Sequence, residues 1–232
     1  AVAAAERLRE VNSEITVESA VHDVDPSNVE GLLDDVDVVV DGSDNFELRY
    51  LVNDVCVKHE IPWIYGGALG AYGTTLSIVP GRTACLHCFI GDMPEPGSVE
   101  TCSSAGVLAM ATGIIANAQA AEALKLLMGT PVRPTALLVD LWQNDFASIA
   151  VSRNERCPVC VAGEYRYLTA DQGRKARVLC GRDTIQISPE GEKRLPLERL
   201  AQEWQRSAGE GSPSVHYHDQ VARLRFGEVD MT

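Results

Sequence analysis

Four of the seven cysteines in the 232-residue sequence form two Cys-x-x-Cys pairs, and these are the residues best suited to metal chemistry. Each pair can present two sulfurs to one face of a tetrahedron, and four thiolates complete the coordination of Zn²⁺ without a water ligand. The sequence therefore predicts a closed, structural zinc site that ties together two segments far apart in the chain. Its ligands would be Cys85, Cys88, Cys157 and Cys160.

Two alternatives to a zinc site at the cysteine pairs are weaker. A single Cys-x-x-Cys could be a thioredoxin-like redox pair, but here there are two, and neither begins a helix after a strand in a β-α-β unit. Chance pairing of buried or redox-active cysteines is the second alternative. His87 lies inside the first pair and is interpreted as a spacer, because four sulfurs already complete the shell. Cys56 and Cys180 lie in apolar periodic runs and are predicted to be core residues.

A second candidate site is the polar sequence DGSDN (41–45), which follows the valine-rich segment 36–40. Ligands of open α/β sheets bind outside the carboxyl ends of strands, so these side chains lie at a candidate binding edge. Asp44 could hold Mg²⁺ together with phosphate oxygens, and Asn45 could hydrogen-bond a nucleotide. Arg49, one turn into the following helix, could face a phosphate with its forked guanidinium.

The alternative for Asp44 is that it only caps the helix that starts near Asn45, since aspartate is among the preferred capping residues. Residue type and position leave both interpretations open. Asp41 belongs to the strand rather than to the loop, and we expect it to have a structural role.

Cys102 lies between an acidic loop (92–100) and a predicted long helix (104–128). A thiol at a helix N-terminus favours the reactive thiolate, which fits a nucleophile or a sulfur acceptor; the alternative is an ordinary half-buried cysteine. A dinucleotide-binding loop is not indicated, because a strand rather than a helix follows the glycines at positions 66, 67, 70 and 73.

The elements that must position these residues alternate between helices and strands, which is typical of the α/β class. The valines of segment 36–40 indicate a strand covered on both faces, as in a parallel sheet. We therefore expect a Rossmann-like mixed, largely parallel sheet. Predicted helices cover 1–12, 26–34, 45–59 and 104–128, and predicted strands cover 15–21, 36–41, 62–68, 74–79 and two segments within 135–151.

Beyond Cys160 the pattern changes to short strands near 176–180, 184–188 and 222–226, with one helix near 196–206. This predicts a small C-terminal α+β domain over residues 166–232, after a main domain over residues 1–165.

Composition limits the classes of partner and the compartment. A net charge of −13 argues against nucleic acid or an anionic membrane as the main partner, because both require a basic surface. The sequence contains no run of 18 apolar residues, so no membrane-spanning helix is predicted. The N-terminus does not have the pattern of a signal peptide. Paired cysteines without a secretion signal predict a reducing, cytoplasmic location.

Four segments, in this order, resemble the ThiF/MoeB/HesA family of adenylyltransferases, which are related to ubiquitin-activating enzymes. The resemblance extends over about residues 1–162. The tail VLCGRDTIQISP (178–189) is similar to the C-terminal segment of ThiF-type enzymes of thiamin thiazole biosynthesis. The four segments are DGSDNFELRYLVND (41–54), PGRTACLHC (80–88), ETCSSAGVLAMATGIIANAQAAEALKLL (100–127) and CPVC (157–160).

The resemblance implies a function and a set of partners. ATP with Mg²⁺ would adenylate the C-terminal glycine of a ubiquitin-like sulfur-carrier protein, and a sulfur donor such as a cysteine desulfurase would complete a thiocarboxylate. Thiamin thiazole synthesis is favoured over molybdopterin synthesis, and a homodimer is implied.

The resemblance also implies roles for individual residues. Asp44 matches the metal-binding acid of the family, Asn45 a nucleotide contact, and Arg49 and Asn53 neighbouring motif positions. Cys102 matches a loop cysteine that can link covalently to the carrier. The four paired cysteines match the structural zinc site.

The sequence departs from the family at its N-terminus, where the strand, the glycine-rich loop and the other nucleotide-binding residues of the first β-α-β part are absent. We therefore expect residues 1–165 to be an adenylation domain without that part, which binds ATP poorly alone. Rival functions are a non-catalytic, zinc-stabilised scaffold that binds a carrier protein, and an activating enzyme for a tRNA base. A dinucleotide-dependent oxidoreductase is a further rival, which the missing glycine fingerprint argues against.

Overall fold

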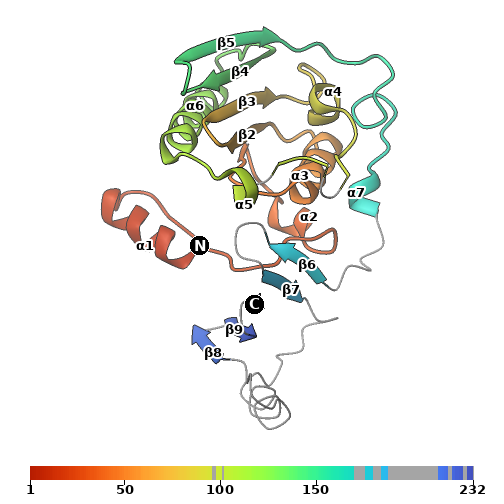
Figure 1. Cartoon of the computed structure of the whole chain (residues 1–232). Helices are drawn as coiled ribbons and strands as arrows, with labels where there is room; N and C mark the ends of the chain where they lie inside the picture. Colours follow the sequence, from red (N-terminus) through yellow and green to blue (C-terminus); the bar gives the residue numbers. More distant parts are fainter. Residues whose placement is uncertain are drawn as a thin grey trace.

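A five-stranded mixed sheet forms the centre of the main body (Figure 1). The computed structural model describes residues 1–95, 98–100 and 102–169, and the backbone of five strands within 176–231. In the central sheet, the first two strands are parallel and the other neighbours are antiparallel. The strands lie in the order β1 (Val39–Val40), β2 (Trp63–Leu69), β3 (Tyr72–Ile78), β4 (Thr135–Asp140) and β5 (Asp145–Ala150).

This arrangement confirms the mixed α/β class but not the expected predominance of parallel pairing. Short turns join β2 to β3 and β4 to β5, and such turns allow only antiparallel neighbours. Within the described residues, parallel pairing in this sheet is limited to β1 and β2, whose connection contains a helix.

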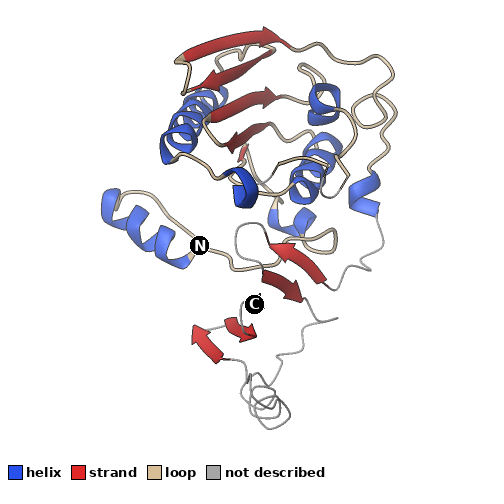
Figure 2. Cartoon of the chain, viewed as in Figure 1, coloured by secondary structure: helices blue, strands red, loops and turns tan. Residues whose placement is uncertain are grey.

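Seven helices occur in the part of the chain that the structure describes (Figure 2). The predicted helices over 1–12 and 45–59 are confirmed. The long helix predicted over 104–128 begins later, because Gly106 adopts a left-handed conformation (φ 73°) and separates α5 from α6. The helices are α1 (Val2–Val11), α2 (Val29–Leu32), α3 (Phe46–Lys58), α4 (Leu86–Ile90), α5 (Cys102–Ala105), α6 (Ala109–Leu127) and α7 (Arg166–Thr169).

Two predictions for the N-terminal third are wrong. Residues 15–21 form no strand: Ile15 and Val21 are exposed, and no described strand pairs with this segment. The valine-rich strand shortens to Val39–Val40, because it pairs with β2 along one edge only. Val40 is 50% exposed, so this strand is not covered on both faces as expected.

Helices α3 and α6 pack on opposite faces of the central sheet. Alternate residues of a strand point to opposite faces, so Trp63 and Tyr65 face α3 while Gly66 faces α6. The main core lies on the α3 side and includes Tyr50 and Cys56 of that helix. On the other side, glycines bring α6 close to the sheet.

Two adjacent polar residues of α3 hold backbone segments that follow later in the chain. Both Asn53 and Asp54 are fully buried. The Asn53 side-chain oxygen accepts a hydrogen bond from the Leu86 N–H (2.9 Å), at the start of α4. The Asp54 carboxylate accepts one from the Tyr167 N–H (2.8 Å), in α7, and the rings of Tyr50 and Tyr167 lie 5.0 Å apart. Helix α3 therefore holds α4, on which the first cysteine pair lies, and α7, which follows the second pair.

The strands predicted near 176–180, 184–188 and 222–226 are present, in a second sheet of order β6-β7-β10-β9-β8. Strands β7 and β10 are parallel, and the other neighbours are antiparallel. The helix predicted near 196–206 lies outside the described residues, and the division at residue 165 stays a prediction. The strands are β6 (Ala176–Leu179), β7 (Thr184–Ile187), β8 (Ser214–His218), β9 (Val221–Phe226) and β10 (Val229–Met231).

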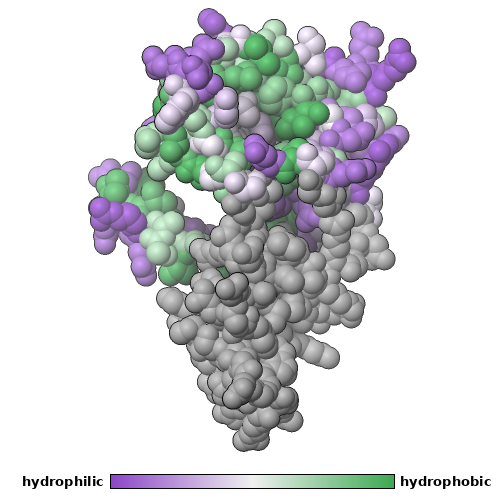
Figure 3. Space-filling model, viewed as in Figure 1, coloured by the Kyte–Doolittle hydropathy of each residue, from purple (hydrophilic) through white to green (hydrophobic). Residues whose placement is uncertain are grey.

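Exposed apolar side chains occur along α6, and apolar surface is visible over this helix and its neighbouring strands (Figure 3). They include Met110, Leu124 and Leu127, and the exposed Met128 follows directly after the helix. In the described part of the chain, every helix is too short or too polar to cross a membrane.

We predict that Gly73→Ala destabilises the fold. A Cβ at this position would lie 2.5 Å from Cγ1 of Ile115, so α6 must move away from β3. Crowding of this kind costs about 1–3 kcal/mol of unfolding free energy, which urea denaturation can measure. Gly113→Ala on α6 is the matched control, since a Cβ there meets no atom within 4 Å and should be neutral or stabilising. Equal stability of the two variants would contradict close packing at Gly73.

We also predict a pH-dependent contribution from Asp54, because burial raises its pKa from 3.8 to about 6. A carboxyl whose pKa is higher in the folded chain stabilises the fold fully below about pH 4 and loses this effect as the pH rises through about 6. Relative to Asp54→Asn, the wild-type unfolding free energy should fall over this interval by at most about 3 kcal/mol. Other groups that titrate in this range are common to both chains and cancel, so a constant difference would contradict the shifted pKa.

Candidate functional site

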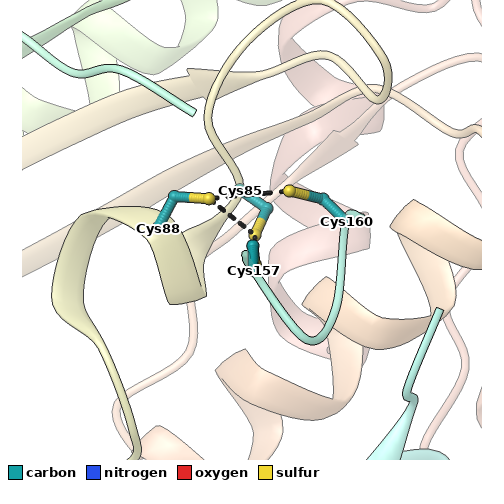
Figure 4. Close-up of side chains that lie close together, drawn as sticks. All are labelled: Cys85, Cys88, Cys157 and Cys160. Carbon is teal, nitrogen blue, oxygen red and sulfur yellow. Dashed lines mark hydrogen bonds between the residues drawn. The ribbon is translucent and has the colours of Figure 1, made fainter. Parts of the chain in front are cut away.

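The four predicted metal ligands lie together between α4 and the turn that precedes α7 (Figure 4). Their sulfur atoms all lie within 4.8 Å of one another. Cys85 caps the N-terminus of α4 and Cys88 lies inside that helix. Cys157 and Cys160 belong to a tight turn, in which the Val161 N–H donates to the Cys157 carbonyl.

The separations between the sulfurs match a tetrahedral metal site. The Sγ of Cys85 lies 3.7 Å from that of Cys88 and 3.6 Å from that of Cys157, and Cys88 and Cys160 are 3.5 Å apart. A tetrahedron with metal–sulfur bonds of about 2.3 Å has edges of about 3.8 Å, whereas a disulfide requires about 2.05 Å. All four cysteines are free thiols, so the cluster could bind a metal ion.

The environment of the cluster favours a cation. Burial, reinforced by neighbouring sulfurs, raises the pKa of Cys160 to about 11 and raises that of Cys85 as well. Burial acts in the same direction on Cys88, but hydrogen bonds, first among them one from the Asn154 N–H (3.3 Å), lower its pKa overall. Four thiolates in this space would repel one another, and a divalent cation would remove that repulsion.

At the second candidate site, Asn45 rather than Asp44 caps α3. The side-chain oxygen of Asn45 accepts a hydrogen bond from the Leu48 N–H at 2.8 Å. Its amide nitrogen donates to the Asp44 carboxylate at 3.3 Å. The interpretation of Asp44 as the helix cap is therefore wrong, and its carboxylate is exposed at the carboxyl end of β1.

Arg49 is held within the fold by the same loop. Its guanidinium donates to the Ser43 carbonyl (2.7 Å) and lies 3.7 Å from the Asp41 carboxylate. It also lies over the rings of Phe46 and Tyr65, each at 5.5 Å. Asp41 is buried and accepts a hydrogen bond from the Ser43 N–H, as its expected structural role requires. A phosphate contact from Arg49 stays a prediction.

Cys102 opens the four-residue helix α5 instead of the long helix. The expectation that it lies at the N-terminus of a long helix is therefore wrong. Its thiol is half-buried and lies 3.8 Å from the Ala68 carbonyl at the end of β2. Gly70 holds this region to the sheet, because its N–H donates to the Gly106 carbonyl and its carbonyl accepts from the Leu108 N–H, both at 2.8 Å.

The structure thus brings the four cysteines together and places the polar loop 41–45 at the end of the parallel pair β1 and β2. Two cavities, of about 420 and 320 Å³, lie elsewhere and contain none of the predicted site residues. Sequence reasoning gave no structural role to Asn53, Asp54 or Gln119. The sequence does contain a signal for a role of Gln119. It is the polar member of a series of buried α6 residues spaced four apart, which also contains Ala111, Ile115 and Ala123.

Comparison with known proteins gives a consistent result. The sequence profile of the ThiF family matches residues 1–159. The chain is 40% identical over 203 residues to the sulfur carrier protein ThiS adenylyltransferase of Bacillus subtilis. The aligned region covers 87% of this chain and 60% of the relative. It is 38% identical to the SAMP-activating enzyme E1 of Haloferax volcanii, over 70% of this chain and 61% of the relative.

The fold is also found in a solved structure. MccB of E. coli with ATP matches with a TM-score of 0.55 and 23% identity, over 67% of this chain and 49% of MccB. The chain spans about 60% of the length of the curated relatives named above. With a profile match over residues 1–159, the chain belongs to the ThiF family.

Proposed function

We propose that this chain is part of an ATP-dependent adenylyltransferase that activates the C-terminal carboxylate of a ubiquitin-like sulfur-carrier protein. The observation that carries the proposal is the exposed carboxylate of Asp44 at the carboxyl end of a parallel strand pair, in a chain of the ThiF family. The names of the two relatives, an adenylyltransferase for ThiS and a SAMP-activating enzyme, support it.

The proposed chemistry is a nucleotidyl transfer. The carrier carboxylate attacks the α-phosphorus of ATP, the bond to the β-phosphate oxygen breaks, and pyrophosphate leaves with its electron pair. When bound, Mg²⁺ neutralises charge that develops on the phosphate oxygens. The Asp44 carboxylate would hold that ion, and Asn45, already fixed as the helix cap, keeps Asp44 in place through its amide N–H.

The second step would give a thiocarboxylate. A sulfur donor such as a cysteine desulfurase would pass its sulfane sulfur to an acceptor thiol, and the persulfide so formed would attack the acyl-adenylate carbonyl, so that a carbon–sulfur bond forms and AMP leaves. A thiol reductant would then cleave the resulting acyl disulfide and release the thiocarboxylate. Cys102 is proposed as the residue that links to the carrier in this step, since its thiol lies half-buried at the end of β2. Thiamin thiazole synthesis is the favoured pathway, because the Bacillus subtilis relative that covers 87% of the chain acts on ThiS.

Zn²⁺ is the proposed occupant of the cysteine cluster. A set of four sulfurs at tetrahedral spacing fits this ion, and no ligand position is left for water, so its role is structural. The exposed apolar side chains of α6 support the proposal that the protein is a homodimer, since an apolar surface of this kind is often covered by a partner.

Metal analysis tests the zinc proposal. The purified chain should contain about one zinc per chain, and Cys157→Ser should lose it, because three sulfurs leave the tetrahedron open. Structural zinc contributes apparent binding free energies of about 10–16 kcal/mol, so chelation should greatly lower the melting temperature. Cys102→Ala is the control and should keep its zinc. A metal-free wild-type chain with an unchanged melting temperature would contradict the proposal.

ATP–pyrophosphate exchange tests the role of Asp44. In a protein that joins this chain to the N-terminal β-α-β part of the family, exchange should require an added ThiS protein, and ThiS without its terminal glycine should not support it. Asp44→Asn should lower the exchange rate at least about 100-fold, as expected when a charged group that stabilises the transition state is lost.

Asp37→Asn is the matched control, because Asp37 is also exposed but precedes β1 instead of following it. Equal rates for Asp44→Asn and the wild type would remove Asp44 from the site. A chain that binds ThiS but never exchanges pyrophosphate would favour the rival function, a carrier-binding scaffold without catalysis.

A further inference from the structure

Gln119 is a buried amide in an otherwise apolar contact between α6 and the central sheet. The buried residues of α6 recur every four positions, and Gln119 is the polar member of that series. It is 4% exposed. A helix that needed only to cover the sheet would carry an apolar side chain here, so the amide requires its own explanation.

The amide nitrogen of Gln119 binds both strands of the parallel pair. It donates to the carbonyl of Asp41 at 2.8 Å and to the carbonyl of Ile64 in β2 at 2.9 Å. The Ile64 carbonyl also accepts the Asp41 N–H at 3.0 Å. Gln119 therefore joins the two strands at the residue where β1 ends and the polar loop begins.

Gly66 of β2 leaves the space in the sheet that the Gln119 amide occupies. A Cβ on Gly66 would lie 2.5–2.6 Å from the carboxamide atoms of Gln119, so only glycine lets the side chain reach both carbonyls. This contact explains why position 66 is a glycine without invoking a nucleotide-binding loop. Gly66→Ala would push the amide away without changing Gln119 itself.

The loop beyond Asp41 is tied to this point by a short series of bonds. The Asp41 carboxylate accepts the Ser43 N–H at 2.9 Å, and Arg49 donates to the Ser43 carbonyl at 2.7 Å. Asp44 and Asn45 follow directly, with Asn45 fixed as the cap of α3. A displacement of the Asp41 backbone would therefore move Asp44.

We propose that Gln119 is a positioning residue that holds the carboxyl end of β1 and, through the loop 41–45, sets the position of the Asp44 carboxylate. Its effect on the reaction rests on the proposed adenylyltransferase function. Its effect on the loop does not, and this separates the two tests.

Hydrogen exchange measures the loop directly. Gln119→Met keeps the length of the side chain and removes both hydrogen bonds, so the amides of residues 41–49 should exchange about tenfold faster. Gly66→Ala should have the same effect on the same residues. Asn117→Met is the matched control, because Asn117 is exposed on the same helix and its amide donates to the Gly113 carbonyl of that helix. Unchanged exchange at 41–49, or equal acceleration in β3, would overturn the proposal.

Steady-state rates of ATP–pyrophosphate exchange test whether the position of Asp44 affects the binding of Mg²⁺·ATP. In ThiS-dependent exchange, Gln119→Met should raise the Mg²⁺·ATP concentration for half-maximal rate about tenfold and leave the ThiS concentration for half-maximal rate unchanged. A faster-exchanging loop with unaltered Mg²⁺·ATP dependence would reduce Gln119 to a purely structural residue. No exchange activity in a wild-type protein that also carries the N-terminal β-α-β part would defeat the proposed function, while the hydrogen-exchange result would still decide whether Gln119 holds the loop.

Discussion

The rest of the structure depends on two hydrogen bonds made by adjacent, fully buried side chains of α3. Asn53 accepts an N–H at the start of α4, and Asp54 accepts one in α7. Each bond fixes a segment next to one cysteine pair, so the two pairs meet although they lie about 70 residues apart. A buried amide and a buried carboxyl are costly without partners. Here a backbone N–H reaches one oxygen of each, while the Asn53 amide nitrogen and the second Asp54 oxygen have no hydrogen-bond partner among the described residues. The cluster is thus arranged by polar contacts of the protein itself.

The same sheet supports a different kind of site on its other face. There, Gly66 and Gly73 face the helix, and α6 lies close enough for Ile115 to fill the space above Gly73 and for Gln119 to bind strand ends. Close approach of this kind limits how far β1 and its loop can move. One face therefore carries the packed core and the cysteine cluster, and the other fixes the strand end that carries Asp44.

Residues with a local signature could be predicted from the sequence, while those defined by long-range contacts could not. The spacing of the cysteine pairs predicts their cluster, and the helical period predicts α3. The valines of 36–40 predict a buried strand, but the length of β1 depends on how many neighbours pair with it, and β2 alone does so in the described chain. Arg49 could not be placed, because its partners depend on how the loop folds back. Asp54 depends on Tyr167, 113 residues away.

Helix α3 connects the two sites and also separates their roles. Asn45 caps its first turn beside Asp44, and Asn53 lies eight residues further along, next to the cluster. At 1.5 Å per residue these positions are about 12 Å apart along the axis, so the polar loop and the cysteine cluster lie beside different turns of the helix. Because four sulfurs around a metal ion would also leave no position for a substrate oxygen, this separation and the coordination number both support the structural role proposed for the cluster.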